Sequence, residues 1–463
     1  MSDSPTRDGD RDPTELVVFD LDGVPRGKWV SARKLASARA RGLGFCNVVF
    51  GWDAADAPYD NTVASGWHTG YPDAACRLDA DAPVRLLPHG EDPARRVPVV
   101  VGDFAGGDLE GVCPRAALRR VLAEADGMGL TAVGGFEYEW FNFEALPTGM
   151  TDVAYGLSPK PGSAPLPRPI TGGMHGYSLI RPAQRAAYYR ALWDNLHAAD
   201  LPLEGLHTET GPGVYEAALA KSRGLEIADR AALFKLAVKR TATAHGLTAG
   251  FMAKWHAGLP GCSGHLHLSL VDADGRNVLT DPNDADGLSA RGRHALAGLL
   301  HGLPALTAVY APTVNSYKRL VPGSWAATSV SWGHDNRTCA LRVVRGQNPS
   351  GADTRVEVRL PGADAHPHLV LATAVACALD GIRRARPLEL PPVTGNAYEA
   401  DGLTPLPTNL AAATAAMRAG QEACAELLGG ELVDHFLRTR HWEWRRYEAA
   451  VTDWERERYL EVI

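Results

Sequence analysis

Three short segments of this chain alternate charged or imidazole side chains with apolar ones. They are Gly-Phe-Glu-Tyr-Glu-Trp-Phe with Glu137 and Glu139, Gly-His-Leu-His-Leu with His265 and His267, and Arg-Val-Glu-Val-Arg-Leu with Arg355, Glu357 and Arg359. Successive side chains of a β-strand point to opposite faces, so each segment predicts a strand with one polar and one apolar face. A fold that buries the three apolar faces therefore gathers the carboxylates, imidazoles and guanidinium groups on the opposite faces of these strands.

The polar faces allow two interpretations. A half-exposed sheet would place them in water, but a solvated face draws mostly on Lys, Thr, Ser and Glu. Paired His, paired Glu and Arg on three separate strands favour a metal-binding or catalytic cluster, because hard divalent cations prefer oxygen ligands with an occasional imidazole.

A fourth segment, residues 203–216, contains a Gly-Pro-Gly turn that can bring two carboxylates toward one ion. Its polar residues are Glu204, His207, Glu209 and Glu216. Alone it could be an ordinary acidic loop, but beside the three strands it supports the same cluster. We expect His207 to be a structural histidine of the core.

Composition limits the class of protein. The 463 residues are 45% hydrophobic, carry a net charge of −7 and include seven scattered cysteines. We see no apolar run that could span a bilayer and no basic cluster, so we expect neither a membrane nor a nucleic-acid partner. The cysteines form no CxxC pair, which predicts neither a disulfide framework nor a zinc site and favours a reducing cytoplasm.

The chain divides near Pro114, which opens an amphipathic helix to about residue 128. Residues 1–14 are polar and predict a disordered tail. Before Pro114 we expect short strands at 16–19, 46–50 and 97–102. After it we expect strands alternating with helices at 183–198, 229–244, 289–302, 367–384, 408–428 and 431–460.

Three further segments belong to the same set: Phe-Met-Ala-Lys at 251–254, Asn-Ser-Tyr-Lys-Arg-Leu-Val-Pro-Gly at 315–323 and Trp-Gly-His-Asp-Asn-Arg-Thr at 332–338. Together these segments resemble the motifs of the glutamine synthetase family, and they follow one another in the family's order. The resemblance runs from about residue 15 to the end. It implies an α+β fold, with a small N-terminal β-grasp domain (15–112) and a larger α/β catalytic domain with a curved antiparallel sheet (113–463). It also implies a homo-oligomer, a dodecamer of stacked hexameric rings.

The resemblance also implies a site for ATP, glutamate and two Mg²⁺ or Mn²⁺ ions. By motif, one ion falls to Glu139, Glu209 and Glu216, and the other to Glu137, His265 and Glu357. Arg319 and Arg359, with Gly261 close by, would hold the carboxylate of the amino acid. Arg337 and Arg342 would face the phosphates, and Glu204, His267 and Ser269 would contact the nucleotide.

One departure concerns the nitrogen donor. Glutamine-forming members carry a glutamate in the loop after Val-Pro-Gly, where this chain has Trp325. An indole can neither attract ammonium by charge nor accept its proton, but it offers an apolar face to an organic substituent. Trp325 could instead pack inward. A second carboxylate is expected from the first domain of a neighbouring subunit, either Asp53 or Asp56, of which we take Asp53 as the candidate.

The sequence therefore predicts an ATP-dependent ligase that joins the γ-carboxylate of glutamate to a primary amine through γ-glutamyl phosphate. A true glutamine synthetase that uses ammonium is the first alternative. The second is a catalytically silent relative with a structural role, which the retained ligand positions disfavour. Tyr398 lies where some bacterial relatives are adenylylated, but the residues that follow do not continue their pattern, and we do not expect its modification.

Overall fold

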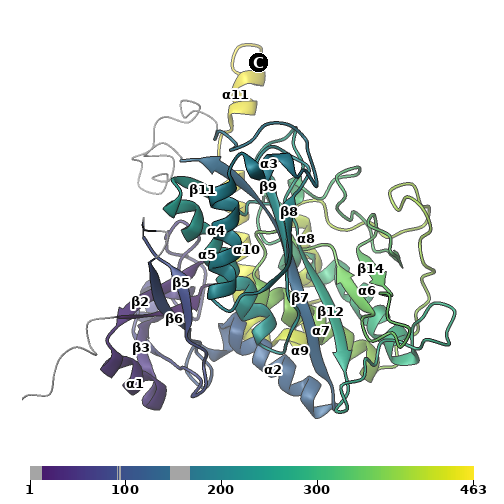
Figure 1. The fold of residues 1–463 in the computed structure, drawn as a ribbon, viewed down its shortest axis with the longest axis horizontal. Helices are drawn as coiled ribbons and strands as arrows, with labels where there is room; N and C mark the ends of the chain where they lie inside the picture. Colours follow the sequence, from purple (N-terminus) through teal and green to yellow (C-terminus); the bar gives the residue numbers. More distant parts are fainter. Residues whose placement is uncertain (1–12, 91, 93–94, 146–166) are drawn as a thin grey trace, which may run out of the picture.

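The computed structural model describes residues 13–90, 92, 95–145 and 167–463, and its strands form two main sheets (Figure 1). The N-terminal sheet has the order β2-β1-β6-β5, with β1 and β6 parallel and the other neighbours antiparallel. Its strands are β1 (Thr14–Phe19), β2 (Pro25–Val30), β5 (Arg85–Pro88) and β6 (Arg96–Val101). The helix α1 (Ala32–Arg41) precedes a separate antiparallel pair, β3 (Leu43–Cys46) and β4 (Asp73–Cys76). The β-grasp assignment stays a prediction.

Two N-terminal expectations need correction. The strand expected over residues 46–50 ends at Cys46, and Asn47–Phe50 form a 3₁₀ helix. There the N–H of Gly51 donates to the carbonyl of Val48 (2.7 Å), the i to i+3 bond of a 3₁₀ turn, and the adjacent residues Val49 and Phe50 are both buried. The tail expected over residues 1–14 ends earlier, because Thr14 already belongs to β1. Residues 1–12 lie outside the described part.

The large sheet has nine strands and is centred on the long strand β7. Its main order is β13-β14-β15-β12-β7-β9-β8, and β10 and β11 also pair with β7. All pairings are antiparallel except β13 with β14, so the expected antiparallel sheet has one parallel edge. The strands are β7 (Thr131–Glu144), β8 (Leu203–Thr208), β9 (Val214–Leu219), β10 (Ser222–Arg223), β11 (Leu247–Gly250), β12 (Gly264–Val271), β13 (Trp332–His334), β14 (Leu341–Val344) and β15 (Arg355–Val358).

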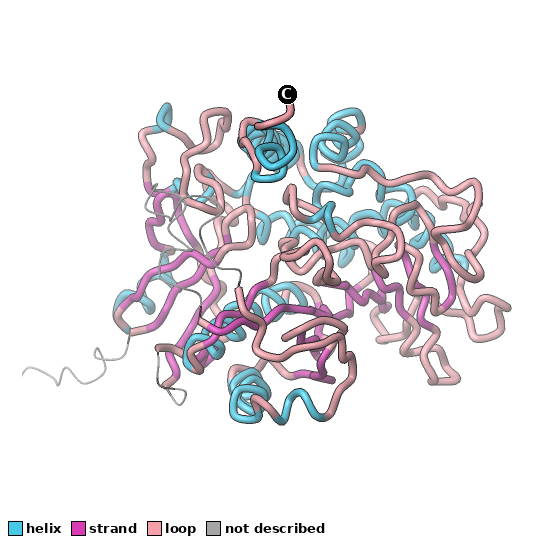
Figure 2. Tube along the Cα trace, turned by 90° about the horizontal axis from the view of Figure 1, so that it is seen from above, coloured by secondary structure: helices cyan, strands magenta, loops and turns pink. Residues whose placement is uncertain are grey.

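The apolar face of β7 packs on the helix α5 (Glu226–Ala244). Tyr138 and Trp140 are fully buried, and their rings lie 5.8 and 5.7 Å from the ring of Phe234 in that helix. Figure 2 shows the strands of the large sheet crossing the middle of the molecule. Because the aromatic residues of β7 face the helix, the alternating Glu137 and Glu139 face the opposite side, as predicted.

The remaining helices follow the expected segments, with one extension and two breaks. The helix expected over residues 289–302 continues to Tyr310 with Pro304 inside it, and Leu303, Leu306 and Val309 of the extension are buried. The helix expected over 408–428 is interrupted at Gly420, a poor helix former. The one expected over 431–460 ends near Glu448, and Thr452 starts a new helix with a capping box to Glu455. The helices are α2 (Pro114–Gly127), α3 (Ile180–Ala183), α4 (Ala186–Ala198), α6 (Ala290–Tyr310), α7 (Pro367–Arg383), α8 (Leu410–Ala419), α9 (Gln421–Leu428), α10 (Gly430–Glu448) and α11 (Asp453–Tyr459). Within the described residues, no helix is long and apolar enough to cross a membrane.

A buried ion-pair network joins the N-terminal part to the helices behind the large sheet. Arg115 in α2 contacts Asp103, which follows β6, at 2.5 Å, and its Nε and Nη2 each donate to Asp229 of α5 at 2.8 Å. His368 of α7 also contacts Asp229, at 2.8 Å. Burial alone would raise the pKa of Asp229, but Arg115 outweighs it and holds the pKa below its usual value.

We predict that Arg115→Ala lowers the free energy of unfolding by about 3–5 kcal/mol, because it leaves buried carboxylates unpaired. Urea denaturation followed by tryptophan fluorescence, at one fixed protein concentration, measures the change. Arg383→Ala, which removes the exposed ion pair with Glu124, is the control and should leave the unfolding midpoint unchanged. Equal effects of the two variants would contradict the role given to Arg115.

Candidate functional site

Strand register brings most of the predicted residues to one face of the large sheet. His265 of β12 lies opposite Glu137 of β7, and His267 lies opposite Glu357 of β15. Along the other edge of β7, Glu139 lies opposite Glu216 of the neighbouring strand β9. Glu216 lies in turn opposite His207 of β8. Directly opposed residues of antiparallel strands share a face. The strands β15, β12, β7, β9 and β8 therefore present these polar residues on one face of the sheet.

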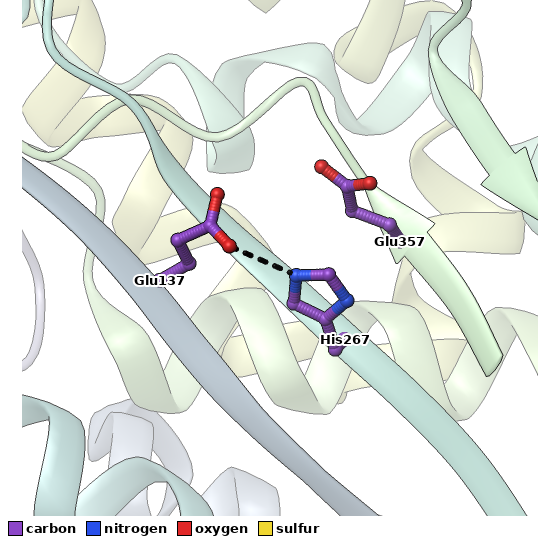
Figure 3. A group of neighbouring side chains, drawn as sticks. All are labelled: Glu137, His267 and Glu357. Carbon is purple, nitrogen blue, oxygen red and sulfur yellow. Dashed lines mark ion pairs between the residues drawn. The ribbon is translucent and has the colours of Figure 1, made fainter. Parts of the chain in front are cut away.

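The first group consists of Glu137, His267 and Glu357, whose ligand atoms lie within 4.8 Å of one another. Figure 3 shows Glu137 and His267 pointing toward one another from adjacent strands, with Glu357 beyond the imidazole. His265 belongs to the same place, because its Nδ1 lies 3.5 Å from Glu137 and 3.2 Å from Glu357. Both histidines thus lie beside the predicted carboxylates.

Two arginines fix the tautomers of these histidines, because a guanidinium can only donate. Arg355 Nε donates to His267 Nδ1 at 3.1 Å, which places the proton of the neutral ring on Nε2, toward Glu137. Arg319 Nη2 lies 3.4 Å from His265 Nε2, which places that proton on Nδ1. The Arg355 contact is the shorter of the two, and Arg319 also donates to the carbonyls of Leu360 and Arg359.

Two further guanidinium contacts hold Glu357. Arg342 Nη1 donates to one carboxylate oxygen at 2.8 Å, and Arg359 Nη1 donates to the other. Burial would raise the pKa of Glu357, but His265 and Arg359 lower it to about 2. Arg342 also donates to Asp335 at 2.9 Å, so its predicted contact with phosphate would require it to leave one of these partners.

The second group consists of His207, Glu209 and Glu216, again with ligand atoms within 4.8 Å. His207 lies 3.8 Å from Glu216, and its side chain is only partly buried. The expectation that His207 is a core histidine is therefore wrong. Its strand partner is Glu216, and this pairing is not visible in the local sequence.

Like charges crowd this second group. Burial first, and then repulsion from Glu137 and Glu139, raise the pKa of Glu216 to about 11. Burial also raises the pKa of Glu139, although the backbone N–H of Ser263 donates to it at 2.6 Å and Arg319 lies near it. Glu139 is placed on the predicted face but is not within the closest group of ligand atoms.

The donor set fits divalent cations. Carboxylates and imidazoles face one another at both groups, and the buried Nδ1 of His265 has no hydrogen-bond partner among the described residues. A cation between these groups would offset the repulsion that keeps Glu216 protonated, and Nδ1 of His265 would become a ligand once its proton moves to Nε2.

Arg319 and Gly261 meet as expected. Arg319 is buried, and a Cβ at Gly261 would lie 2.8 Å from its side chain and 2.5 Å from the carbonyl of Ala253. Only glycine allows the chain to pass this close to the aliphatic part of the Arg319 side chain and to the carbonyl of Ala253.

Trp325 does not pack inward, because 67% of its surface is exposed. Its φ of +58° is uncommon for a bulky residue, and its carbonyl accepts from Arg359 Nη2 at 3.3 Å. The same arginine donates through Nε to the carbonyl of Arg337 at 3.1 Å. Trp325 and Arg337 are thus held by an arginine that also contacts Glu357.

The other predicted residues lie outside the two groups. Ser269 donates to the carbonyl of Thr354 at 2.8 Å, and Glu204 is exposed on β8. Asp53 is buried in the N-terminal part, where Trp442 of α10 donates to it at 3.1 Å, whereas Asp56 pairs with Arg26 at 2.6 Å. The hydroxyl of Tyr398 donates to the carbonyl of Ala326 at 3.0 Å.

Two neighbours of the site were missed. Arg355 was grouped with the polar strand but given no role, although it sets the tautomer of His267. Tyr177 stacks on His207 with ring centroids 4.5 Å apart, and 70% of its surface is exposed. The signal available for Tyr177 was the glycine-rich segment at 172–176, which is typical of a loop.

This chain is similar to known proteins in sequence and in fold. The family described as glutamine synthetase, catalytic domain, matches residues 111–459. A type-1 glutamine synthetase of Dictyostelium discoideum is 41% identical over 97% of this chain and 84% of its own length. A gamma-glutamylethanolamide synthetase of Streptomyces coelicolor is 38% identical, covering 98% of this chain and 93% of the relative, and a glutamate–isopropylamine ligase of Pseudomonas sp is 33% identical, covering 98% and 95%. The solved structure of a GmaS–ADP complex is 28% identical, covers 98% of both chains and has a TM-score of 0.78.

We predict that divalent cation binding at pH 7.5 releases about one proton, because Glu216, with a pKa near 11, must lose its proton to become a ligand. Calorimetric titration with Mn²⁺ in two buffers of different ionisation enthalpy measures the release. Glu216→Gln should weaken Mn²⁺ binding and abolish the proton release, whereas Glu204→Gln on the neighbouring strand should change neither. A binding enthalpy independent of the buffer would contradict this prediction.

Proposed function

This chain belongs to the glutamine synthetase family, and on that premise we propose that it is an ATP-dependent ligase that joins the γ-carboxylate of glutamate to a primary organic amine. The observation that carries the proposal is Trp325. By the resemblance, its exposed indole takes the place of a glutamate of glutamine-forming members, and Arg359 donates to the backbone carbonyls of both Trp325 and Arg337. One relative is named for joining glutamate to isopropylamine and another for making gamma-glutamylethanolamide, and both names support an organic amine as the nitrogen donor.

The reaction proceeds in two steps. The γ-phosphoryl group of ATP passes to the γ-carboxylate of glutamate, which gives γ-glutamyl phosphate and ADP. The amine nitrogen then attacks the carbonyl carbon, phosphate leaves and the nitrogen loses a proton, so that a γ-glutamylamide forms. The divalent cations, when bound, neutralise phosphate charge.

The chain's own residues position the substrates. Arg319, buried and close to Gly261, holds the carboxylate of glutamate together with Arg359. Arg337 is exposed on the loop between β13 and β14 and can reach phosphate oxygens. Asp53, from the neighbouring copy in the assembly that the resemblance implies, would accept the amine proton.

For the cation ligands we propose His265 with Glu137 and Glu357, and leave His267 as a donor to the nucleotide. His265 Nδ1 lies 3.5 Å from Glu137 and 3.2 Å from Glu357, whereas His267 Nε2 lies 3.4 Å from Glu137 and His267 approaches Glu357 less closely, within 4.8 Å. Arg319 can release His265 and keep two carbonyl acceptors, but Arg355 Nε has His267 as its acceptor. Glu139, Glu209 and Glu216 would hold the second ion, and His207 stands beside it.

A true glutamine synthetase remains the second candidate, because the Dictyostelium relative is 41% identical. The two candidates differ only in the nitrogen donor, and Trp325 favours the amine. Retained carboxylate and imidazole positions disfavour a silent structural protein. Cytoplasmic location and stacked-ring assembly stay predictions.

We predict that organic amines exceed ammonium as nitrogen donors by at least tenfold in kcat/KM. ADP release with ATP, Mg²⁺ and glutamate, with mass analysis of the product, measures this for ammonium, methylamine, ethanolamine, isopropylamine and longer alkylamines. Trp325→Glu should shift the ratio at least tenfold toward ammonium, while Trp325→Phe, which keeps an apolar ring, should retain the preference. Wild-type protein that prefers ammonium would make the chain a glutamine synthetase.

A second prediction separates the histidines. His265→Ala should reduce the number of tightly bound Mn²⁺ ions from two to one, because it removes a ligand. His267→Ala should retain both ions but weaken ATP binding at least tenfold. Mn²⁺ counting by electron paramagnetic resonance and ATP titration by calorimetry provide the two measurements. The reverse outcome would assign the cation to His267.

A further inference from the structure

Trp325 forms one wall of a pocket of about 520 Å³ that no role has yet been given. Three segments line it: Trp325 itself, residues 334–338 between β13 and β14, and residues 392–395. Pockets of roughly 300–1,000 Å³ hold small molecules in proteins. The space is therefore far larger than ammonium or a methyl group requires.

The pocket borders the candidate site. Trp325 and Arg337 belong to its lining, and both accept hydrogen bonds from Arg359 through their carbonyls, at 3.3 and 3.1 Å. Arg359 also contacts Glu357, the carboxylate shared by the first group. An amine whose nitrogen lies beside Trp325 would thus direct its substituent into this pocket.

The walls are held in place before any ligand binds. Asn336 Nδ2 donates to the carbonyls of Val393 (3.0 Å) and Gly395 (2.8 Å), which ties two of the three segments together. Thr338 Oγ1 accepts from the N–H of Ala397 at 2.9 Å. A preformed pocket costs little to order when a substituent enters it.

The charges of the lining disfavour a second cationic group. Asp335 is the carboxylate of the lining, and it already accepts from Arg342 at 2.9 Å. The other formal charge is the cation of Arg337, while Trp325, Pro392 and Val393 offer apolar surface. An ammonium group at the far end of a substituent would meet one carboxylate that already pairs with Arg342, and the positive charge of Arg337.

We infer that this pocket binds the substituent of the amine and selects primary amines with an uncharged chain over diamines and polyamines. The inference rests on the proposed function and adds the chemical class of the nitrogen donor. Trp325, the segment 334–338 and the segment 392–395 then determine specificity, while glutamate activation takes place on the sheet.

The experiment compares methylamine, n-pentylamine and putrescine in the assembled wild-type protein and in two variants. Pentylamine and putrescine have the same number of heavy atoms and differ in the charge of the far end. We expect pentylamine to exceed putrescine at least tenfold in kcat/KM. Thr394→Trp should lower the ratio of pentylamine to methylamine at least tenfold, because the indole fills the pocket. Thr404→Trp, an exposed position near this segment but outside the lining, should leave the ratio unchanged.

The outcomes separate this inference from the proposed function. Ammonium exceeding every amine would refute the proposed function, and this inference with it. Amines that exceed ammonium but show an unchanged ratio in Thr394→Trp would refute only the pocket. Putrescine equal to or better than pentylamine in the wild type would overturn the selection against a second charge.

Discussion

The antiparallel pairing of β7 with β12 and β9 determines the position of nearly every residue of the site. Glu137 meets His265, and Glu139 meets Glu216, through backbone hydrogen bonds that do not depend on these side chains. A slip of one residue would turn the carboxylates into the helix layer and the aromatic rings into the site. The packing of Tyr138 and Trp140 on α5 therefore fixes the polar face as firmly as it fixes the core.

The polar face of the large sheet concentrates charged side chains, and the protonation state of each carboxylate depends on how its charge is paired. Arg342 and Arg359 hold Glu357 ionised, whereas Glu216 has only acidic neighbours and His207 close to it. The two halves of the site thus differ in the free protein. One is preorganised by guanidinium groups, and the other keeps a proton until a cation takes its place.

Local pattern accounts for much of this arrangement. Alternation in β7, β12 and β15 was enough to predict the polar face, and motif order was enough to predict the family. The pairing of residues across strands could not be predicted, because no local signal places His207 beside Glu216 or Arg355 against His267. The 3₁₀ turn at Asn47–Phe50 was missed for a related reason, since a short apolar run has no periodicity that distinguishes a strand from a tight turn. The orientation of Trp325 could be determined only from the structure, since indole side chains occur both in cores and at binding surfaces.

The loop that carries Trp325 is anchored by its backbone. Arg359 binds the carbonyl of Trp325, and the hydroxyl of Ser324 donates to the carbonyl of Arg319 at 2.7 Å. The side chain at 325 contributes to neither bond. Under the proposed function, a single codon can therefore change the group offered to the nitrogen donor while the backbone anchors of the loop stay the same.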